Sequence, residues 1–86
     1  MLSQPLNDRK RIKMTLNLLE KGQSATITAV NAEQGLRNRF NSFGVVKGAT
    51  VHAEQHTLAK QTMEIRINKT RMALRVSEAE KVEISL

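Results

Sequence analysis

The residues best suited to metal chemistry stand in one short stretch, His52-Ala53-Glu54-Gln55-His56. Two imidazoles and a carboxylate are suitable ligands for iron(II) or zinc. If the stretch is a strand, His52, Glu54 and His56 share its outer face, with successive same-face residues about 7 Å apart. Side chains spaced in this way diverge from a single centre, and the chain has no cysteine to complete a ligand shell. We therefore predict an exposed polar strand face rather than a metal site, with these three residues as the candidate ligands if a metal binds.

Catalytic chemistry has little support elsewhere in the sequence. The only aspartate is Asp8, and neither histidine can be paired with a nucleophile from the sequence. The lack of cysteine excludes disulfides, thiolate catalysis and iron–sulfur ligation. No glycine-rich phosphate loop is present. We predict a protein that is not an enzyme, with no catalytic residues and no cofactor.

The basic residues divide the chain into a leader and a domain. Residues 1–13 contain four basic residues and one acidic residue, which amounts to half of the net charge of +6. This polar run, interrupted by Pro5, predicts a flexible basic leader, and residues 14–86 predict one folded domain. A basic leader attracts nucleic acid, anionic lipid or an acidic protein surface through the same electrostatic field.

No apolar stretch is long enough to act as a membrane span or a secretory signal. A helix needs about 20 apolar residues to cross a bilayer. The N-terminal segment MLSQPLNDRKRIK also lacks the apolar core of a signal peptide. We therefore expect a cytoplasmic protein without direct membrane insertion.

Apolar residues at every second position predict about five short strands. These strands are expected at residues 24–30, 50–56, 63–68, 71–76 and 81–86, with Val76 and Leu86 among the inward-facing residues. Two or three short helices are expected after Thr15, at the stripe of Leu36, Phe40 and Phe43, and at a capping box from Ser77 to Glu80. The predicted fold class is mainly β, a small and strongly bent β-barrel.

The stripe of Leu36, Phe40 and Phe43 helps to decide whether the basic charge indicates nucleic-acid binding. It contains both phenylalanines, and the chain has no tyrosine or tryptophan. Modules that bind single-stranded nucleic acid need exposed aromatic side chains on which bases stack. Because the spacing turns the stripe toward the core, we expect both phenylalanines to be buried and no nucleic-acid partner. A small basic nucleic-acid-binding barrel remains the alternative, favoured by the net charge and the leader sequence DRKRIK.

A resemblance to a known family is carried by three segments in order, TLNLLEKGQSATI, LRNRFNSFGVVKGATV and RMALRVSEAEKVEI. Together they resemble the FeoA family, the small cytoplasmic proteins of bacterial ferrous iron uptake, over residues 14–86. The matching positions are Leu16, Leu19, Gly22, Ala25, Ile27, Leu36, Arg39, Phe40, Phe43, Gly44, Gly48, Val51, Ala73, Leu74, Arg75, Ser77, Glu78 and Ala79. The resemblance implies an SH3-like β-barrel with an accessory role beside FeoB, a membrane transporter that has a cytoplasmic guanine-nucleotide-binding domain.

Two segments depart from the family pattern. The family usually has glycine and proline in the loop between its second and third strands, where this chain has TLAKQT. It also commonly has glycine after the third strand, where Asn68-Lys69 stands here. Asparagine tolerates a positive φ, so a tight turn is still expected at the second position.

Apolar and basic residues in the predicted loops suggest a partner surface. We predict that the turn after the 36–43 helix and the following TLAKQT loop face FeoB, with Val45, Val46, Lys47, Leu58 and Lys60 as the contact residues. The alternative is that the two valines pack under the end of the helix.

The predicted function is therefore that of a cytoplasmic accessory or regulatory protein of ferrous iron uptake that binds the FeoB transporter. A metal-binding chaperone is a further alternative, and it rests on His52 and His56 alone.

Overall fold

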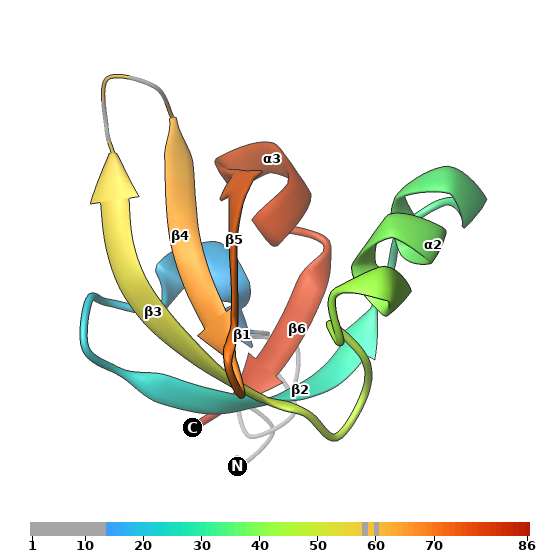
Figure 1. Cartoon of the computed structure of the whole chain (residues 1–86), viewed down its shortest axis with the longest axis horizontal. Helices are drawn as coiled ribbons and strands as arrows, with labels where there is room; N and C mark the ends of the chain where they lie inside the picture. Colours follow the sequence, from blue (N-terminus) through green and yellow to red (C-terminus); the bar gives the residue numbers. More distant parts are fainter. Residues whose placement is uncertain (1–13, 58, 60) are drawn as a thin grey trace, which may run out of the picture.

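The residues that the computed structural model describes, 14–57, 59 and 61–86, form one antiparallel sheet of six strands. The strands are β1 (Met14–Thr15), β2 (Ser24–Val30), β3 (Thr50–Thr57), β4 (Thr62–Ile67), β5 (Thr70–Arg75) and β6 (Val82–Ser85). Their order across the sheet is β1-β6-β2-β3-β4-β5. The sheet is strongly bent but not closed (Figure 1). The five strands predicted from alternation are all present, and β1 is an additional strand of two residues.

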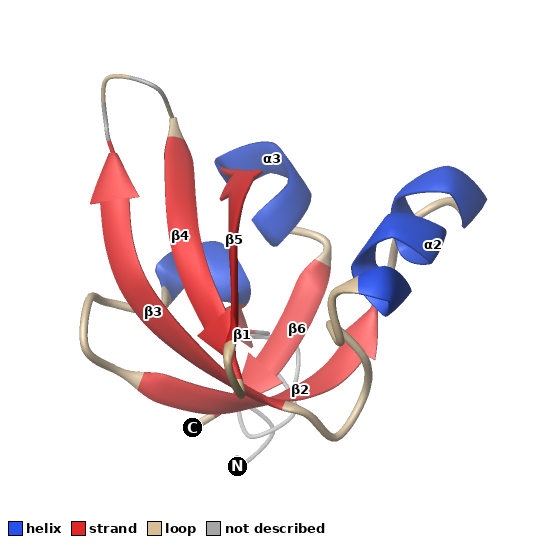
Figure 2. Cartoon of the chain, viewed as in Figure 1, coloured by secondary structure: helices blue, strands red, loops and turns tan. Residues whose placement is uncertain are grey.

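Three short helical segments accompany the sheet. They are the 3-10 turn η1 (Leu16–Leu18), α2 (Gln34–Ser42) and α3 (Val76–Ala79). Figure 2 shows α2 beyond the end of β2, while α3 connects β5 to β6. None of the helices in the described part of the chain is long and apolar enough to cross a membrane.

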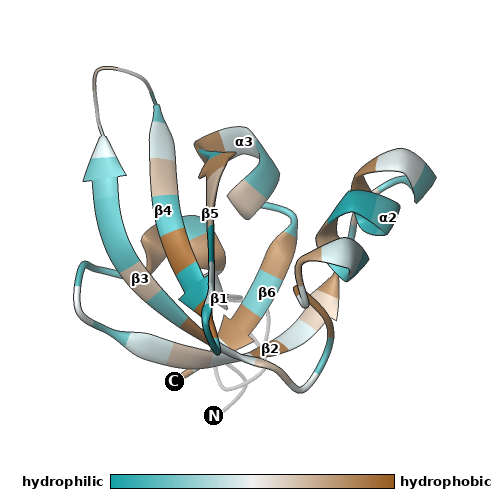
Figure 3. Cartoon of the chain, in the orientation of Figure 1, coloured by the Kyte–Doolittle hydropathy of each residue, from teal (hydrophilic) through white to brown (hydrophobic). Residues whose placement is uncertain are grey.

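The core lies on the inner face of the bent sheet. Alternate residues along each strand point into it, as Met63, Ile65 and Ile67 do from β4. Figure 3 shows the resulting alternation of hydrophobic and hydrophilic residues along this strand. Leu16, the first residue of η1, and Leu19, which directly follows η1, are both fully buried.

The chain reversal after α2 corrects the prediction that both phenylalanines are buried. Phe40 is fully buried, but 38% of Phe43 is exposed. The helix ends at Ser42, and Gly44 turns the chain with φ +85°. The Val45 N–H then donates to the Phe40 carbonyl over 2.9 Å, and Val45 takes the place in the core that the stripe assigned to Phe43.

The start of α3 also differs from the prediction. A capping box was expected from Ser77 to Glu80, but the helix begins at Val76 with Arg75 as the N-cap residue. The Glu78 carboxylate accepts a hydrogen bond from the Arg75 backbone N–H over 3.0 Å. Val76, expected on an inward strand position, therefore opens a helix and is half-buried.

Strand ends and turns agree with the sequence in one position and differ from it in another. Leu86 was expected to face the core, but it follows the end of β6 and is 71% exposed. Asn68 has φ +56° in the two-residue turn between β4 and β5, as predicted. In the TLAKQT segment, Gln61 adopts a φ of +52°, a left-handed conformation that favours glycine.

The two phenylalanines provide a matched test of this packing. Phe40→Ala should lower the free energy of unfolding by about 3–5 kcal/mol, because it leaves a cavity in the core. Phe43→Ala should lower it by only about 1 kcal/mol, because much of the ring already contacts water. Urea unfolding followed by circular dichroism measures both values. Equal losses would show that Phe43 is packed as firmly as Phe40.

Candidate functional site

A β-bulge in β3 separates the three candidate metal ligands. The pairing of β3 with β4 shifts register between Ala53 and Gln55, so that Glu54 is the extra residue. Before the bulge, His52 stands opposite Arg66. After it, His56 stands opposite the buried Met63, so the strand has exchanged its faces. The prediction that His52, Glu54 and His56 share one outer face is therefore wrong.

Each of the three side chains has its own partner. The His52 Nδ1 atom lies 2.6 Å from the Ser24 hydroxyl oxygen. Glu54 accepts a hydrogen bond from the Arg66 Nε–H over 2.9 Å in an ion pair. Among the described residues, no group of three or more histidine, cysteine, aspartate or glutamate side chains could hold a metal ion.

The third candidate metal ligand, His56, has a structural role. Its Nε2 atom lies 2.7 Å from the Leu19 carbonyl oxygen. Since a carbonyl oxygen can only accept, Nε2 carries the proton and donates it. This hydrogen bond joins the end of η1 to β3.

The predicted partner residues separate into buried and exposed ones. Val45 is fully buried, so the prediction that it is exposed to a partner is wrong. Val46 is 39% exposed and Lys47 is exposed, on a turn directly after α2. Leu58 and Lys60 lie outside the described residues.

Phe43 is a surface residue that the sequence analysis missed. With Val46 and Lys47 it forms what we call the α2 turn surface, a short exposed segment that combines apolar and basic side chains. The exposure of Phe43 could have been inferred from the sequence. Gly44 ends the helix directly after Phe43, so Phe43 is the last apolar residue of the helical stripe. A hollow of about 330 Å³ opens beside this surface, and its lining residues include Arg37, Val46 and Lys47.

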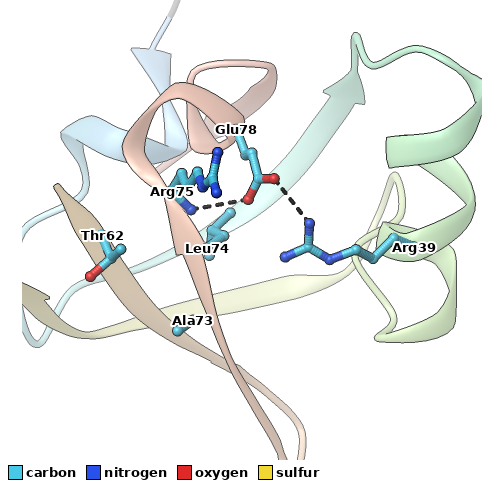
Figure 4. A pocket seen from close by; sticks show the side chains of 6 residues that line it. All are labelled: Arg39, Thr62, Ala73, Leu74, Arg75 and Glu78. Carbon is cyan, nitrogen blue, oxygen red and sulfur yellow. Dashed lines mark hydrogen bonds and ion pairs between the residues drawn. The ribbon is translucent and has the colours of Figure 1, made fainter. Parts of the chain in front are cut away.

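Two arginines attach α2 to the rest of the molecule. Arg37 donates from its Nη2 atom to the Val30 carbonyl over 3.0 Å and from Nε to the Ala32 carbonyl over 3.4 Å. Arg39 forms an ion pair with Glu78 of α3, with 2.9 Å between Nη1 and Oε2. The Arg39–Glu78 ion pair lies at a pocket of about 390 Å³ between α2, β5 and α3 (Figure 4).

Glu78 carries the clearest electrostatic shift in this region. Burial raises the pKa of its carboxyl group, but three favourable contacts outweigh that effect. They are the hydrogen bond from the Arg75 backbone, the hydrogen bond from Arg39, and the positive charge of both arginines. The pKa of Glu78 therefore lies below its ordinary value of 4.5.

The bent antiparallel sheet, its short helical connections and its single apolar core define a small SH3-like module. The FeoA domain model matches residues 14–86, and the chain belongs to the FeoA family. The Fe(2+) transport protein A of Campylobacter jejuni is 36% identical over 73 residues, which cover 85% of this chain and 99% of that protein. Its counterpart in Helicobacter pylori is 35% identical over 68 residues, 78% of this chain and 87% of the relative.

Solved structures agree with this assignment. FeoA of Chlorobium tepidum has a TM-score of 0.79 and 29% identity, over 85% of this chain and 70% of that protein. FeoA of Stenotrophomonas maltophilia, an SH3 domain protein solved with zinc, has a TM-score of 0.74 and 30% identity, over 84% and 89% of the two chains. A manganese-dependent transcriptional repressor shares the fold at 13% identity, with a TM-score of 0.79 over 41% of its chain.

The Glu78 contacts predict a pH-dependent stability. Because its pKa is lowered in the folded state, Glu78 stabilises the protein above pH 4.5, and this contribution is lost as the pH falls through the folded-state pKa. Glu78→Gln should cost about 1 kcal/mol or less at neutral pH, and the difference from wild type should vanish in acid. Urea unfolding from neutral to acidic pH measures it. The exposed Glu80, changed to Gln, is the control, and a pH-independent Glu78→Gln difference would contradict the assignment.

The His56 contact predicts a structural role without a metal role. His56→Ala should reduce the free energy of unfolding by about 1 kcal/mol, because the Leu19 carbonyl loses its donor. Titration with iron(II) or zinc should give the same isotherm for His56→Ala, His52→Ala and wild type. A shared loss of tight metal binding in both variants would show that the histidines act together.

Proposed function

We propose that the protein is a cytoplasmic accessory protein of bacterial ferrous iron uptake that acts by binding the FeoB transporter. The observation that carries this proposal is the FeoA match over residues 14–86, supported by relatives named as Fe(2+) transport proteins. The relatives' names place them in Fe(2+) transport, and a membrane transporter is the partner that we propose for this chain.

The proposed contact is the α2 turn surface. Phe43 and Val46 expose apolar area within one turn, and Lys47 adds a positive charge beside them. Exposed aromatic side chains are enriched at the centre of protein interfaces, and the rim around them is polar. Leu58 and Lys60 stay in the proposal on the basis of their sequence position.

We further propose that the protein has no enzymatic activity and no resident cofactor. The His52, Glu54 and His56 side chains are engaged with three separate partners, which leaves them no common substrate or metal position. FeoA of Stenotrophomonas maltophilia was solved as a zinc complex, and that observation concerns that protein.

One observation favours the nucleic-acid alternative. Phe43 is partly exposed and lies near Lys47, so one aromatic side chain is available for stacking. A single aromatic side chain offers only a small surface for base stacking. Binding driven by phosphates and binding through an apolar protein contact also respond differently to salt. Binding through phosphates weakens by orders of magnitude between about 50 and 200 mM salt. A partly apolar protein contact weakens far less.

The decisive experiment measures binding to detergent-solubilised FeoB at about 150 mM salt, with and without guanine nucleotide. We expect a saturable complex with wild-type protein. Val46→Asp should weaken it at least roughly tenfold, because the variant places a charge in an apolar contact. Leu18→Asp is the matched control, since Leu18 is 56% exposed and lies on η1.

Two results would contradict this proposal. One is the absence of a FeoB complex in either nucleotide state together with tight, salt-sensitive binding to RNA or DNA. The other is equal weakening by Val46→Asp and Leu18→Asp, which would remove the α2 turn surface from the interface while leaving FeoB as the partner.

A further inference from the structure

The sheet has one long open edge in the described part of the chain. Its outermost strands are β1, which has two residues, and β5, which has six. An unpaired strand edge presents a row of N–H and C=O groups that can pair with another extended chain. The outer edge of β5 is therefore the place where this sheet could grow.

The hydrogen-bond pattern identifies which groups of β5 are open. Residues along an edge strand alternately direct their backbone groups toward the neighbouring strand and away from it. The Arg75 N–H points away from β4, because the Glu78 carboxylate accepts it over 3.0 Å. By the same alternation, Arg71 and Ala73 also point away from β4. Within the described residues, no bond to these two N–H groups is present.

The side chains along this edge are basic. Arg71 and Arg75 are exposed and flank Ala73, which leaves a small side chain between two positive ones. Lys69 is exposed in the adjoining turn. On the neighbouring strand, Arg66 is already paired with Glu54, and Glu64 stands opposite Ala73. Lys69, Arg71 and Arg75 therefore outnumber the one carboxylate that faces them from β4, and the edge keeps a positive excess.

The pocket beside the edge has the same sign of charge. It is lined by Arg39, Ala73, Arg75 and Glu78 among others, with a volume of about 390 Å³. Figure 4 shows Glu78 between the backbone of Arg75 and the guanidinium group of Arg39. One carboxylate therefore stands against two arginines, and the pocket retains a positive excess.

We propose that the open edge of β5 binds an extended acidic segment of a partner protein, which adds to the sheet as a further strand. The segment's backbone would pair with Arg71 and Ala73, and its carboxylates would contact Arg71 and Arg75. A second copy of this chain is a poor occupant, because each copy carries a net charge of +6. This inference goes beyond the binding of FeoB, and it holds whichever protein supplies the segment.

A synthetic peptide of alternating glutamate and valine with blocked ends tests the proposal. Added to the full chain labelled with ¹⁵N, it should shift the amide resonances of Arg71 and Ala73 saturably and slow their hydrogen exchange. Two N-methylated forms of the peptide distinguish strand pairing from charge attraction. Methylation of the alternate residues that face β5 should abolish binding, and methylation of the other set should preserve it.

Variants of the edge provide the second arm of the test. Ala73→Pro removes an outward N–H without removing a bond to β4, and it should abolish peptide binding. Arg71→Glu should weaken binding roughly tenfold or more, the loss expected for one charge-assisted contact. Lys21→Glu is the matched control, since it alters the net charge equally at an exposed loop position and should leave binding unchanged.

Several results would overturn the proposal. Binding that tolerates both methylated peptides, or that falls equally with Arg71→Glu and Lys21→Glu, would show attraction by the overall positive field alone. Tighter binding of a single-stranded RNA at the same edge would identify a nucleic acid as the occupant. If Ala73→Pro failed to fold, the methylated peptides would still decide between these results.

Discussion

The structure depends on burying one continuous set of apolar side chains inside a single bent sheet. All sixteen buried residues in the described ranges are hydrophobic, and none of them is polar or charged. A chain of 86 residues without cysteine has no covalent cross-link that could replace this core. Polar and charged side chains must therefore find their partners at the surface. His52, Glu54 and His56 are each bonded to a neighbouring residue in this way.

Much of the fold could be predicted because strand alternation is a local signal. The spacing of Met63, Ile65 and Ile67 predicts β4, and Asn68 predicts the turn that follows it. The bulge in β3 could not be predicted in this way. The bulge inserts one residue of β3 relative to β4. The register between these two strands is defined only in the folded sheet, so the sequence of β3 alone does not reveal the bulge. The candidate metal site failed for this reason, since a single extra residue moved His56 to the other face.

Helix ends were the second limit of the sequence analysis. The stripe of Leu36, Phe40 and Phe43 fits an ideal helix, but the helix ends at Ser42. Gly44 then reverses the chain, and Val45 is fully buried while 38% of Phe43 is exposed. The smaller side chain enters because the reversed backbone directs it inward, and the larger ring remains at the surface. The candidate partner surface changed accordingly, from the two valines to a segment that includes Phe43.

The position of α2 follows from a small number of contacts. Phe40 is the only buried residue of the helix, and the two arginines supply the polar attachments, Arg37 to the end of β2 and Arg39 to Glu78. Glu78 is itself fixed by its hydrogen bond to the start of α3. The ion pair between Arg39 and Glu78 therefore joins α2 to α3, next to the open edge of the sheet at β5.

An open sheet has a functional consequence that a closed barrel lacks. Closure would pair every strand and leave only loops and side chains for recognition. Here β5 keeps its outer backbone groups, and the arginines on either side of Ala73 give that edge a definite charge. The fold alone does not dictate a partner, because a manganese-dependent repressor shares it at 13% identity. What distinguishes this FeoA-family chain is the chemistry placed around the shared core. In the described residues, that chemistry consists of the α2 turn surface and the basic side chains along β5.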